Sequence, residues 1–297
     1  MNLMPHQAVT AVNDKSTLTL ALGDGRQLAY GEYGDPGGRP LFYLHGIPGS
    51  RQEFPLADAT VRELGIRLLV PDRPGYGLSD SQAGRTLLDW PADLAHLADA
   101  LGLDQFAVLG FSGGGPYALA CAHALEERIT AVGLISSLAP LDAPGMWDAV
   151  SPAFRGTHEL AASDPALLEQ QLAPAAASPE AVLAMFEEPA PAIDKARFAE
   201  PAFRALCLAN LTESLRQGAG ATAWDLHLVD RPWGFDPARI QRPVQLWHGT
   251  EDINAPIAMG DYLAQTLPHC TARFLEGEGH YSILNHMEMI LRKLMTG

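Results

Sequence analysis

The sequence predicts a doubly wound α/β fold with a mostly parallel sheet. Continuous apolar runs, each ended by glycine, proline or polar residues, occupy residues 40–46, 67–72, 105–111, 131–137 and 243–249. Runs of this kind suit strands that are buried on both faces, as in a parallel sheet. Stretches of helical composition lie between them, for example 87–101 and 116–125. Strands that alternate with helices in this way place the helices on both sides of the sheet.

Two further segments complete the expected fold. Residues 17–34 hold Gly23-Asp24-Gly25 between two runs of alternating polarity, which is typical of a β-hairpin. From residue 141 to residue 232 the alternation of strands and helices stops, and the chain becomes rich in alanine and proline. We expect this segment, 141–232, to be a helical cap inserted between two parts of the core, 1–140 and 233–297.

Helix starts within the cap are indicated by a capping residue or a glutamate directly before a proline. They occur at Ser163-Asp164-Pro165, Ser178-Pro179 and Glu200-Pro201. Proline is favoured at the first helical position because the backbone N–H that it lacks has no partner there.

The composition limits the classes of function. With 297 residues, of which 47% are hydrophobic and 19% charged, the chain is long enough to bury a sizeable core. The formal net charge is −15 and no lysine–arginine cluster occurs, which argues against nucleic acid and anionic membranes as partners. No uninterrupted apolar run approaches the roughly 20 residues of a membrane-spanning helix. Monomer and homodimer are both compatible with these features.

Cysteine and histidine usage predicts a cytoplasmic protein without a metal or a cofactor. Cys121, Cys207 and Cys270 are far apart and lack CxxC spacing, which predicts reduced thiols. Residues 1–15 have no basic region followed by an apolar core, so we expect no signal peptide there. The remaining histidines are scattered, and neither metal-ligand spacing nor pairing with a carboxylate is predicted for them: His96, His123, His158, His227, His248, His269 and His286.

Residues 110–114, Gly-Phe-Ser-Gly-Gly, fit the pattern G-x-S-x-G between a predicted strand and a predicted helix. In that context Ser112 sits on a sharp turn, with its hydroxyl projecting above the sheet. The N–H of Gly113, at the start of the helix, then faces the oxygen on which negative charge develops during acyl transfer. A glycine-rich turn around an idle serine is the alternative, and the rest of the chain has to decide between the two.

A second loop, His45-Gly46-Ile47-Pro48-Gly49-Ser50, follows the apolar run 40–46. A loop of this type after the third strand supplies the second oxyanion N–H, here that of Ile47. His45 is itself a candidate base. We expect it to be a buried structural histidine, because a separate histidine is better placed.

That histidine is His280, in a glycine-flanked loop after a short predicted strand over 272–275. Asp252 follows the apolar run 243–249. Ser112, Asp252 and His280 therefore each come at the carboxyl end of a predicted strand. Ligand sites in open α/β sheets gather at that edge. The three residue types suit a nucleophile, an acid that orients the base, and the base.

Other charged residues near these motifs have different interpretations. Asp142 and Glu251 are alternatives to Asp252 as the acid that orients His280. Asp252 is preferred because its position after the run 243–249 is the commoner one for this acid. Asp72-Arg73 is expected to form a structural turn with an ion pair. Arg51 is expected at the surface.

Five motifs occur in a fixed order along the chain: HGIPGS (45–50), DRPGYGLSD (72–80), GFSGGG (110–115), HGTEDINAP (248–256) and GEGH (277–280). In these motifs and their order the chain resembles the α/β-hydrolase superfamily. The segment 141–232 resembles the helical cap of lidded serine esterases and of the proline-iminopeptidase-like group. The resemblance implies the α/β-hydrolase fold and the triad order serine, aspartate, histidine.

The predicted chemistry is acyl transfer through an acyl-enzyme, which needs no cofactor. His280 takes the proton of Ser112, and Asp252 orients His280. The N–H groups of Ile47 and Gly113 hold the oxyanion.

The favoured substrate is a small, fairly apolar carboxylic ester. Residues that are candidates for lining its acyl pocket are Trp147, Met185, Phe186 and Trp224. An aminopeptidase of the proline-iminopeptidase type is the first alternative, although that group usually has tryptophan where this chain has Gly113. A lactonase and a carbon–carbon hydrolase are further alternatives. A small-ligand receptor on the same fold is the alternative from another class.

Overall fold

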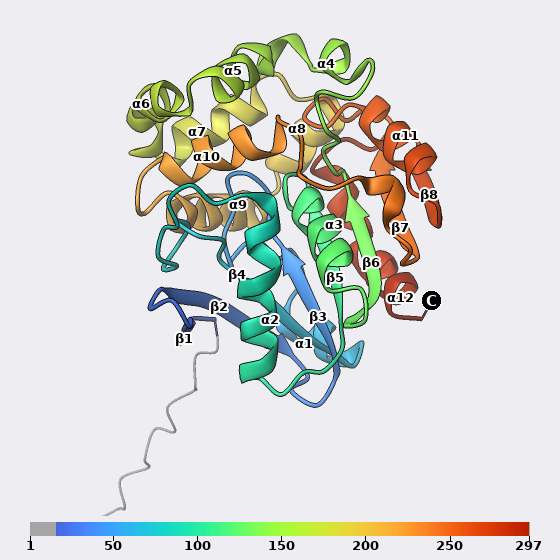
Figure 1. Ribbon diagram of the computed structural model, residues 1–297. Helices are drawn as coiled ribbons and strands as arrows, with labels where there is room; N and C mark the ends of the chain where they lie inside the picture. The colour runs from blue at the N-terminus through green and yellow to red at the C-terminus, as the bar shows by residue number, and fades with distance from the viewer. Residues whose placement is uncertain (1–15, 297) are drawn as a thin grey trace, which may run out of the picture.

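An eight-stranded sheet forms the centre of the computed structural model, which describes residues 16–296 (Figure 1). The strands are β1 (Leu18–Ala21), β2 (Gln27–Gly34), β3 (Arg39–Leu44), β4 (Ile66–Pro71), β5 (Phe106–Phe111), β6 (Ile129–Ile135), β7 (Val244–Gly249) and β8 (Cys270–Leu275). Their order across the sheet is β1-β2-β4-β3-β5-β6-β7-β8. The expectation of no signal peptide in 1–15 falls outside the described residues.

The sequence-based prediction of a mostly parallel sheet is confirmed. The pairs from β4 to β8 are all parallel, and β1 and β2 form the predicted hairpin and pair antiparallel. The five predicted runs correspond to β3, β4, β5, β6 and β7, with ends that differ by one or two residues. Strands buried on both faces carry continuous apolar sequence, which is why these runs could be recognised.

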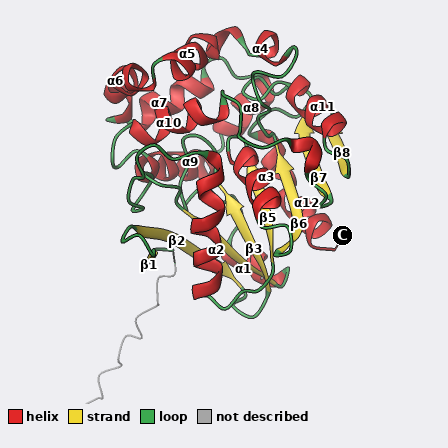
Figure 2. Ribbon diagram, viewed as in Figure 1, coloured by secondary structure: helices red, strands yellow, loops and turns green. Residues whose placement is uncertain are grey.

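Helices cover both faces of the sheet, as Figure 2 shows by the yellow strands between red helices. Alternate side chains of one strand separate into two cores: Phe42 and Leu44 of β3 pack in one, and Leu41 and Tyr43 pack in the other. This separation follows from the two-residue period of a strand. The helices and single turns that flank the sheet are α1 (Asp58–Glu63), η1 (Leu87–Asp89), α2 (Trp90–Ala100), α3 (Gly114–Ala124), η2 (Pro237–Arg239), α11 (Ile257–Thr266), η3 (Ser282–His286) and α12 (Met287–Thr296).

Between β6 and β7 the chain has helices and loops but no strand, and its helices lie over the carboxyl ends of the strands (Figure 1). Its helices are α4 (Met146–Ala149), α5 (Pro152–Ser163), α6 (Pro165–Ala176), α7 (Pro179–Glu187), α8 (Ala192–Phe198), α9 (Pro201–Ser214) and α10 (Gly220–Val229). The three predicted starts are those of α6, α7 and α9. Asp164 and Ser178 cap two of them by accepting from the backbone N–H of Leu167 and Ala181. The division of the chain into core and cap stays a prediction.

The register of the strands brings their carboxyl ends to one level. Leu44 of β3 lies opposite Gly110 of β5, which lies opposite Leu134 of β6. The loops after β3, β5, β7 and β8 consequently meet under the helices α4–α10. None of the helices in residues 16–296 is long and apolar enough to cross a membrane.

Candidate active site

Ser112 occupies the turn between β5 and α3 in a strained backbone conformation. Its φ is 54°, in the left-handed region that side chains other than glycine rarely adopt. Its backbone is fixed on both sides: its N–H donates to the carbonyl of Ile135 (2.9 Å), and its carbonyl accepts from Gly115 (3.0 Å). A Cβ on Gly114 would lie 2.0 Å from the carbonyl oxygen of Leu44. Glycine is therefore required here for α3 to begin directly against β3.

The loop after β3 lies against the start of α3. A Cβ on Gly113 would come within 2.4 Å of the Ile47 side chain, so these two residues are in direct contact. Ile47 and Ser112 also line the same cavities. The structure thus brings together the two residues whose N–H groups the sequence predicts as oxyanion donors.

His280 and Asp252 form a buried pair at the carboxyl ends of β8 and β7. His280 Nδ1 and Asp252 Oδ2 are 2.8 Å apart. The other carboxylate oxygen accepts the backbone N–H groups of Asn254 and Ala255, both at 2.9 Å. With Nδ1 engaged, Nε2 is the ring nitrogen available to a hydroxyl, and His280 lines a cavity together with Ser112.

The charges around His280 favour its protonated form. Burial of the ring alone would lower the pKa of His280, but the Asp252 carboxylate, with smaller contributions from Asp194 and Glu53, raises it overall. Burial conversely opposes the charge of Asp252, and the adjacent His280 ring more than offsets this, so the pKa of Asp252 is lowered. His280 and Asp252 therefore stabilise each other's charged forms.

The alternative base and the alternative acid lie elsewhere. His45 is fully buried, with Nδ1 2.9 Å from the carbonyl of Gly46 and Nε2 accepting the N–H of Arg73. Burial lowers the pKa of His45 well below its ordinary value. It acts as a structural residue of the loop, as expected. Asp142 is exposed and lines a separate surface hollow with Trp233.

The expected position of Arg51 is wrong. Its side chain is 3% exposed and forms ion pairs of 2.6 Å with both Asp72 and Glu213. Arg73 instead pairs with Asp225 of α10 at 2.8 Å, with both side chains fully buried. The basic side chains of the two motif loops are thus used to bind the helices α9 and α10 to the core. The sequence could not indicate this, because the partner carboxylates lie more than a hundred residues away.

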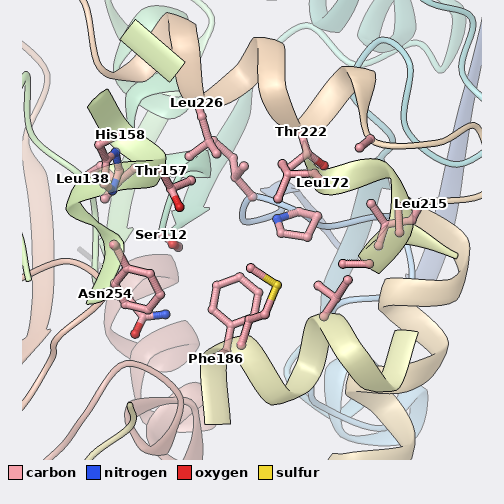
Figure 3. Close-up of a pocket in the computed structure, with 18 residues that line it drawn as sticks. Ser112, Leu138, Thr157, His158, Leu172, Phe186, Leu215, Thr222, Leu226 and Asn254 are labelled. Atoms are coloured by element: carbon pink, nitrogen blue, oxygen red, sulfur yellow. The ribbon is translucent and has the colours of Figure 1, made fainter. Parts of the chain in front are cut away.

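Two cavities meet at Ser112. The larger has a volume of about 110 Å³ and extends under α5, α6 and α7 (Figure 3). The smaller, of about 50 Å³, is lined by His280, Glu53 and Asn210 on its polar side. Residues that line both cavities are Ile47, Pro48, Ser112, Phe186 and Asn254. A molecule with two unequal arms joined at a reactive centre fits this arrangement.

A family model described as the alpha/beta hydrolase fold matches residues 39–287. The chain belongs to this family. The match includes all three predicted triad positions and the whole segment between β6 and β7.

Similar proteins place this hydrolase among enzymes of several activities. It is 31% identical to a non-heme chloroperoxidase of Streptomyces lividans over 41% of the chain and 45% of that protein. It is 30% identical to a pimeloyl-[acyl-carrier protein] methyl ester esterase of Aromatoleum aromaticum over 75% of the chain and 84% of that protein. Several of the curated relatives are matched over less than half of their own length.

The fold is shared with solved structures. A hydrolase from Pseudomonas aeruginosa superposes with a TM-score of 0.71 at 23% identity, over 97% of this chain and all of the other. The likeness shows the architecture and carries no information on the substrate.

Only part of the predicted pocket lines the cavities of the hydrolase. Met185 and Phe186 of α7 line the larger cavity. Trp224 does not line it: its indole N–H donates to the carbonyl of Arg85 (3.1 Å). Trp147 packs against the core on the α3 side of the sheet and lines neither cavity. These two aromatic residues hold the helices in place.

Asp194 of α8 binds the His280 loop, a role that was not predicted from the sequence. Its carboxylate accepts the backbone N–H groups of His280 (2.9 Å), Tyr281 (3.0 Å) and Ser282 (2.8 Å). Asp194 is fully buried. The helix α8 was not predicted and a lone carboxylate is an ordinary feature, so nothing in the sequence marks Asp194.

Glu53 is a second buried carboxylate that the sequence did not indicate. It accepts the N–H of Gly46 (2.8 Å) and the hydroxyl of Tyr43 (3.2 Å), so it supports the loop that carries Ile47. Burial raises the pKa of Glu53 from 4.5 to about 7, although its hydrogen bonds oppose the shift. Its place seven residues after Gly46, at the end of a conspicuous motif, is the one signal available.

We expect Glu53→Gln to change the pH dependence of stability. A raised carboxyl pKa means that the folded state holds a proton that the unfolded chain has lost between pH 4.5 and about 7. The free energy of unfolding of the wild type should therefore fall by about 3 kcal/mol as the pH rises through this range. Glutamine keeps an acceptor for the N–H of Gly46 and does not titrate. The free energy of unfolding of the variant, relative to the wild type, should therefore rise by that amount over the same pH range.

Urea unfolding at a series of pH values measures this difference. Glu63→Gln, a change of an exposed glutamate on α1, is the matched control and should show no pH-dependent difference from the wild type. If the free energies of unfolding of Glu53→Gln and the wild type differ by the same amount at every pH, the raised pKa of Glu53 is contradicted.

Proposed function

We propose that this hydrolase cleaves small, fairly apolar carboxylic esters through an acyl-enzyme formed on Ser112. The observation that carries the proposal is the strained turn of Ser112 on a cavity wall shared with His280, whose other ring nitrogen is held by Asp252. A serine at a sharp turn after a strand, a histidine and an orienting carboxylate are the three parts of a nucleophilic triad.

Each residue has one role in the proposed reaction. His280 accepts the proton of Ser112 at Nε2 while the serine oxygen attacks the carbonyl carbon. Asp252 keeps the Nδ1 proton in place and stabilises the imidazolium that forms. The N–H groups of Ile47 and Gly113 bind the oxyanion, each contributing about 10²–10³ in rate. The alcohol leaves with the proton from His280, and water then releases the acid by the same steps.

The two cavities suggest how the ester lies. The larger cavity is lined mainly by aliphatic and aromatic side chains and suits the acyl chain. The smaller cavity, next to His280, suits a short alcohol, since the leaving oxygen must receive a proton from that ring. In this proposal the helices of 141–232 act as a cap that forms the roof of the acyl pocket.

The comparisons support an ester as substrate. The relative matched over most of both chains is named as a methyl ester esterase, that is, an enzyme whose leaving alcohol is small. A short alcohol arm also agrees with the smaller cavity of this hydrolase.

We also propose a reducing, cytoplasmic location. Cys121, Cys207 and Cys270 are all free thiols in the described structure, and burial raises the pKa of each. Free thiols without disulfides are usual in that compartment.

Reaction with a fluorophosphonate tests the mechanism. We expect one adduct per chain, on the peptide that contains Ser112, because only an activated serine reacts quickly with this reagent. Labelling should slow as the pH falls below the pKa of His280, since the protonated ring cannot accept the serine proton. Mass spectrometry of the digested protein locates the adduct.

The adduct should disappear in Ser112→Ala, which lacks the nucleophile, and in His280→Ala, which lacks the base. Ser79→Ala is the matched control. It changes a buried serine outside the motif at residues 110–115 and should label normally. Turnover of a nitrophenyl ester by the wild type then shows that the protein is an enzyme, whereas a receptor that keeps the triad would not turn the ester over. An adduct on another serine, or no adduct at all, would refute the mechanism.

A further inference from the structure

A second histidine–carboxylate pair lies inside the helical cap. His158 of α5 places Nδ1 2.9 and 2.8 Å from the two carboxylate oxygens of Asp230, the residue after α10. Both side chains are buried, with 8% and 2% exposed. The sequence-based expectation of no carboxylate partner is therefore wrong for His158, and it is also wrong for His286, whose Nε2 lies 2.7 Å from Glu278 Oε1. The two residues are 72 positions apart, and only the packing of α5 against α10 brings them together.

The histidine of this pair belongs to the wall of the larger cavity. His158 lines the cavity together with Ser112, and Figure 3 shows both on the same side of it, with Thr157 between them in this view. The bond from Nδ1 to Asp230 fixes the ring and leaves Nε2 without a hydrogen-bond partner in residues 16–296. Nε2 is also absent from the fully enclosed polar atoms that lack a partner, so it is not sealed off, and His158 is one of the residues that line the cavity.

An unpaired ring nitrogen in a mainly apolar cavity has a consequence for the ligand. A plain hydrocarbon arm would cover Nε2 and leave it without water or any other partner, which weakens binding of that arm. A ligand with a polar hydrogen at that point restores the bond. Selection by a buried polar group of this kind is stronger than selection by the size of an apolar pocket.

The charges of the cavity restrict the polar group to an uncharged one. None of the described residues that line the larger cavity is Lys, Arg, Asp or Glu. A carboxylate on the ligand would have no cation to neutralise it and would face the Asp230 carboxylate across the ring. A hydroxyl carries no charge and can donate its proton to the Nε2 lone pair.

We propose that His158, held by Asp230, is a specificity site that binds a hydroxyl group on the acyl chain of the substrate. The inference rests on the proposed function, because it places the acyl chain of an ester in the larger cavity. It narrows the substrate class to esters of hydroxy acids. Asp230 is a positioning residue in this site, since it acts through the ring of His158.

The test compares nitrophenyl hexanoate with its hydroxy derivatives on the α, β or ω carbon. For the carbon that reaches His158, we expect the hydroxy ester to have a kcat/KM at least about tenfold above that of the plain ester. The corresponding methoxy ester should show no such advantage, because an ether oxygen has no proton to donate. Calorimetric binding of the matching hydroxy and plain amides gives the same comparison without any reaction.

Replacement of His158 by phenylalanine should reduce the hydroxy-to-plain ratio to about one. The single variant leaves the Asp230 carboxylate buried without a partner and can therefore fold poorly. The double variant His158→Phe/Asp230→Leu removes both polar partners and serves in that case. His227→Phe is the matched control, because His227 lies in the same cap, outside both cavities, and should keep the wild-type ratio.

Two failures are distinguishable. If the wild type hydrolyses the plain and hydroxy esters equally, or prefers the methoxy ester, the hydroxyl site is refuted and the proposed function stands. If no ester is hydrolysed and Ser112 is not labelled, the proposed function fails. The amide-binding ratio then decides the hydroxyl site alone: a ratio that depends on His158 supports it, and equal binding refutes it.

Discussion

Replacement of Asp252 by asparagine is expected to lower kcat by about four orders of magnitude while the protein stays folded. Asp252 Oδ2 is 2.8 Å from His280 Nδ1 and so fixes a proton on that nitrogen. An amide nitrogen at the same place would donate to Nδ1, leave the proton on Nε2 and remove the acceptor that Ser112 needs. The backbone bonds of Asn254 and Ala255 to the other oxygen can persist in the variant, which is why we expect little loss of fold.

Steady-state kinetics with a nitrophenyl ester, together with circular dichroism, measures this effect. Asp142→Asn is the matched control: Asp142 follows β6, the other place where a triad acid can occur, and its side chain is exposed. It should retain the wild-type kcat. Normal activity in Asp252→Asn, combined with a large loss in Asp142→Asn, would show that the acid is assigned to the wrong strand.

The fold and the positions after the strands could be predicted because local sequence determines them. A parallel strand buried on both faces must be apolar throughout, so β3 to β7 are visible as runs, and the residue after each run lies at one edge of the sheet. Ser112 and Asp252 follow two such strands, and His280 follows β8, the short strand beside β7 at the edge of the sheet. Their proximity therefore needed only the topology of the sheet, with no knowledge of side-chain packing.

The residues around this centre could not be predicted, because their roles depend on contacts between distant elements. Glu53, Asp194 and His158 are polar side chains in unremarkable sequence, and each is held at the cavities or the His280 loop by a partner that tertiary packing supplies. The same reason explains the error for Trp224. An aromatic residue in a cap can face the cavity or the core, and the helix period does not decide between them without the orientation of α10.

Asp194 connects α8 to the loop of His280, the proposed base, and its removal should have the second large effect. One carboxylate oxygen accepts the N–H groups of Tyr281 and Ser282, and the other accepts that of His280. In Asp194→Ala all three buried N–H groups lose their partner, at about 1–3 kcal/mol for each. The His280 loop should then shift, and a displacement of about 1 Å costs on the order of 10²-fold in kcat. KM should change less, because Asp194 lines neither cavity.

Asp194→Asn separates positioning from simple loss of structure. Its amide oxygen can still accept the N–H groups of Tyr281 and Ser282, so stability should fall less than in Asp194→Ala. The negative charge of Asp194 helps to raise the pKa of His280, so its removal lowers that pKa. A base with a lower pKa stays unprotonated to lower pH, and the acid limb of the kcat/KM profile should therefore move to lower pH.

Asp148→Asn, at an exposed carboxylate of α4, should leave both stability and the acid limb unchanged. An acid limb that does not move in Asp194→Asn, or a loss confined to KM, would show that Asp194 only supports the cap and does not position His280.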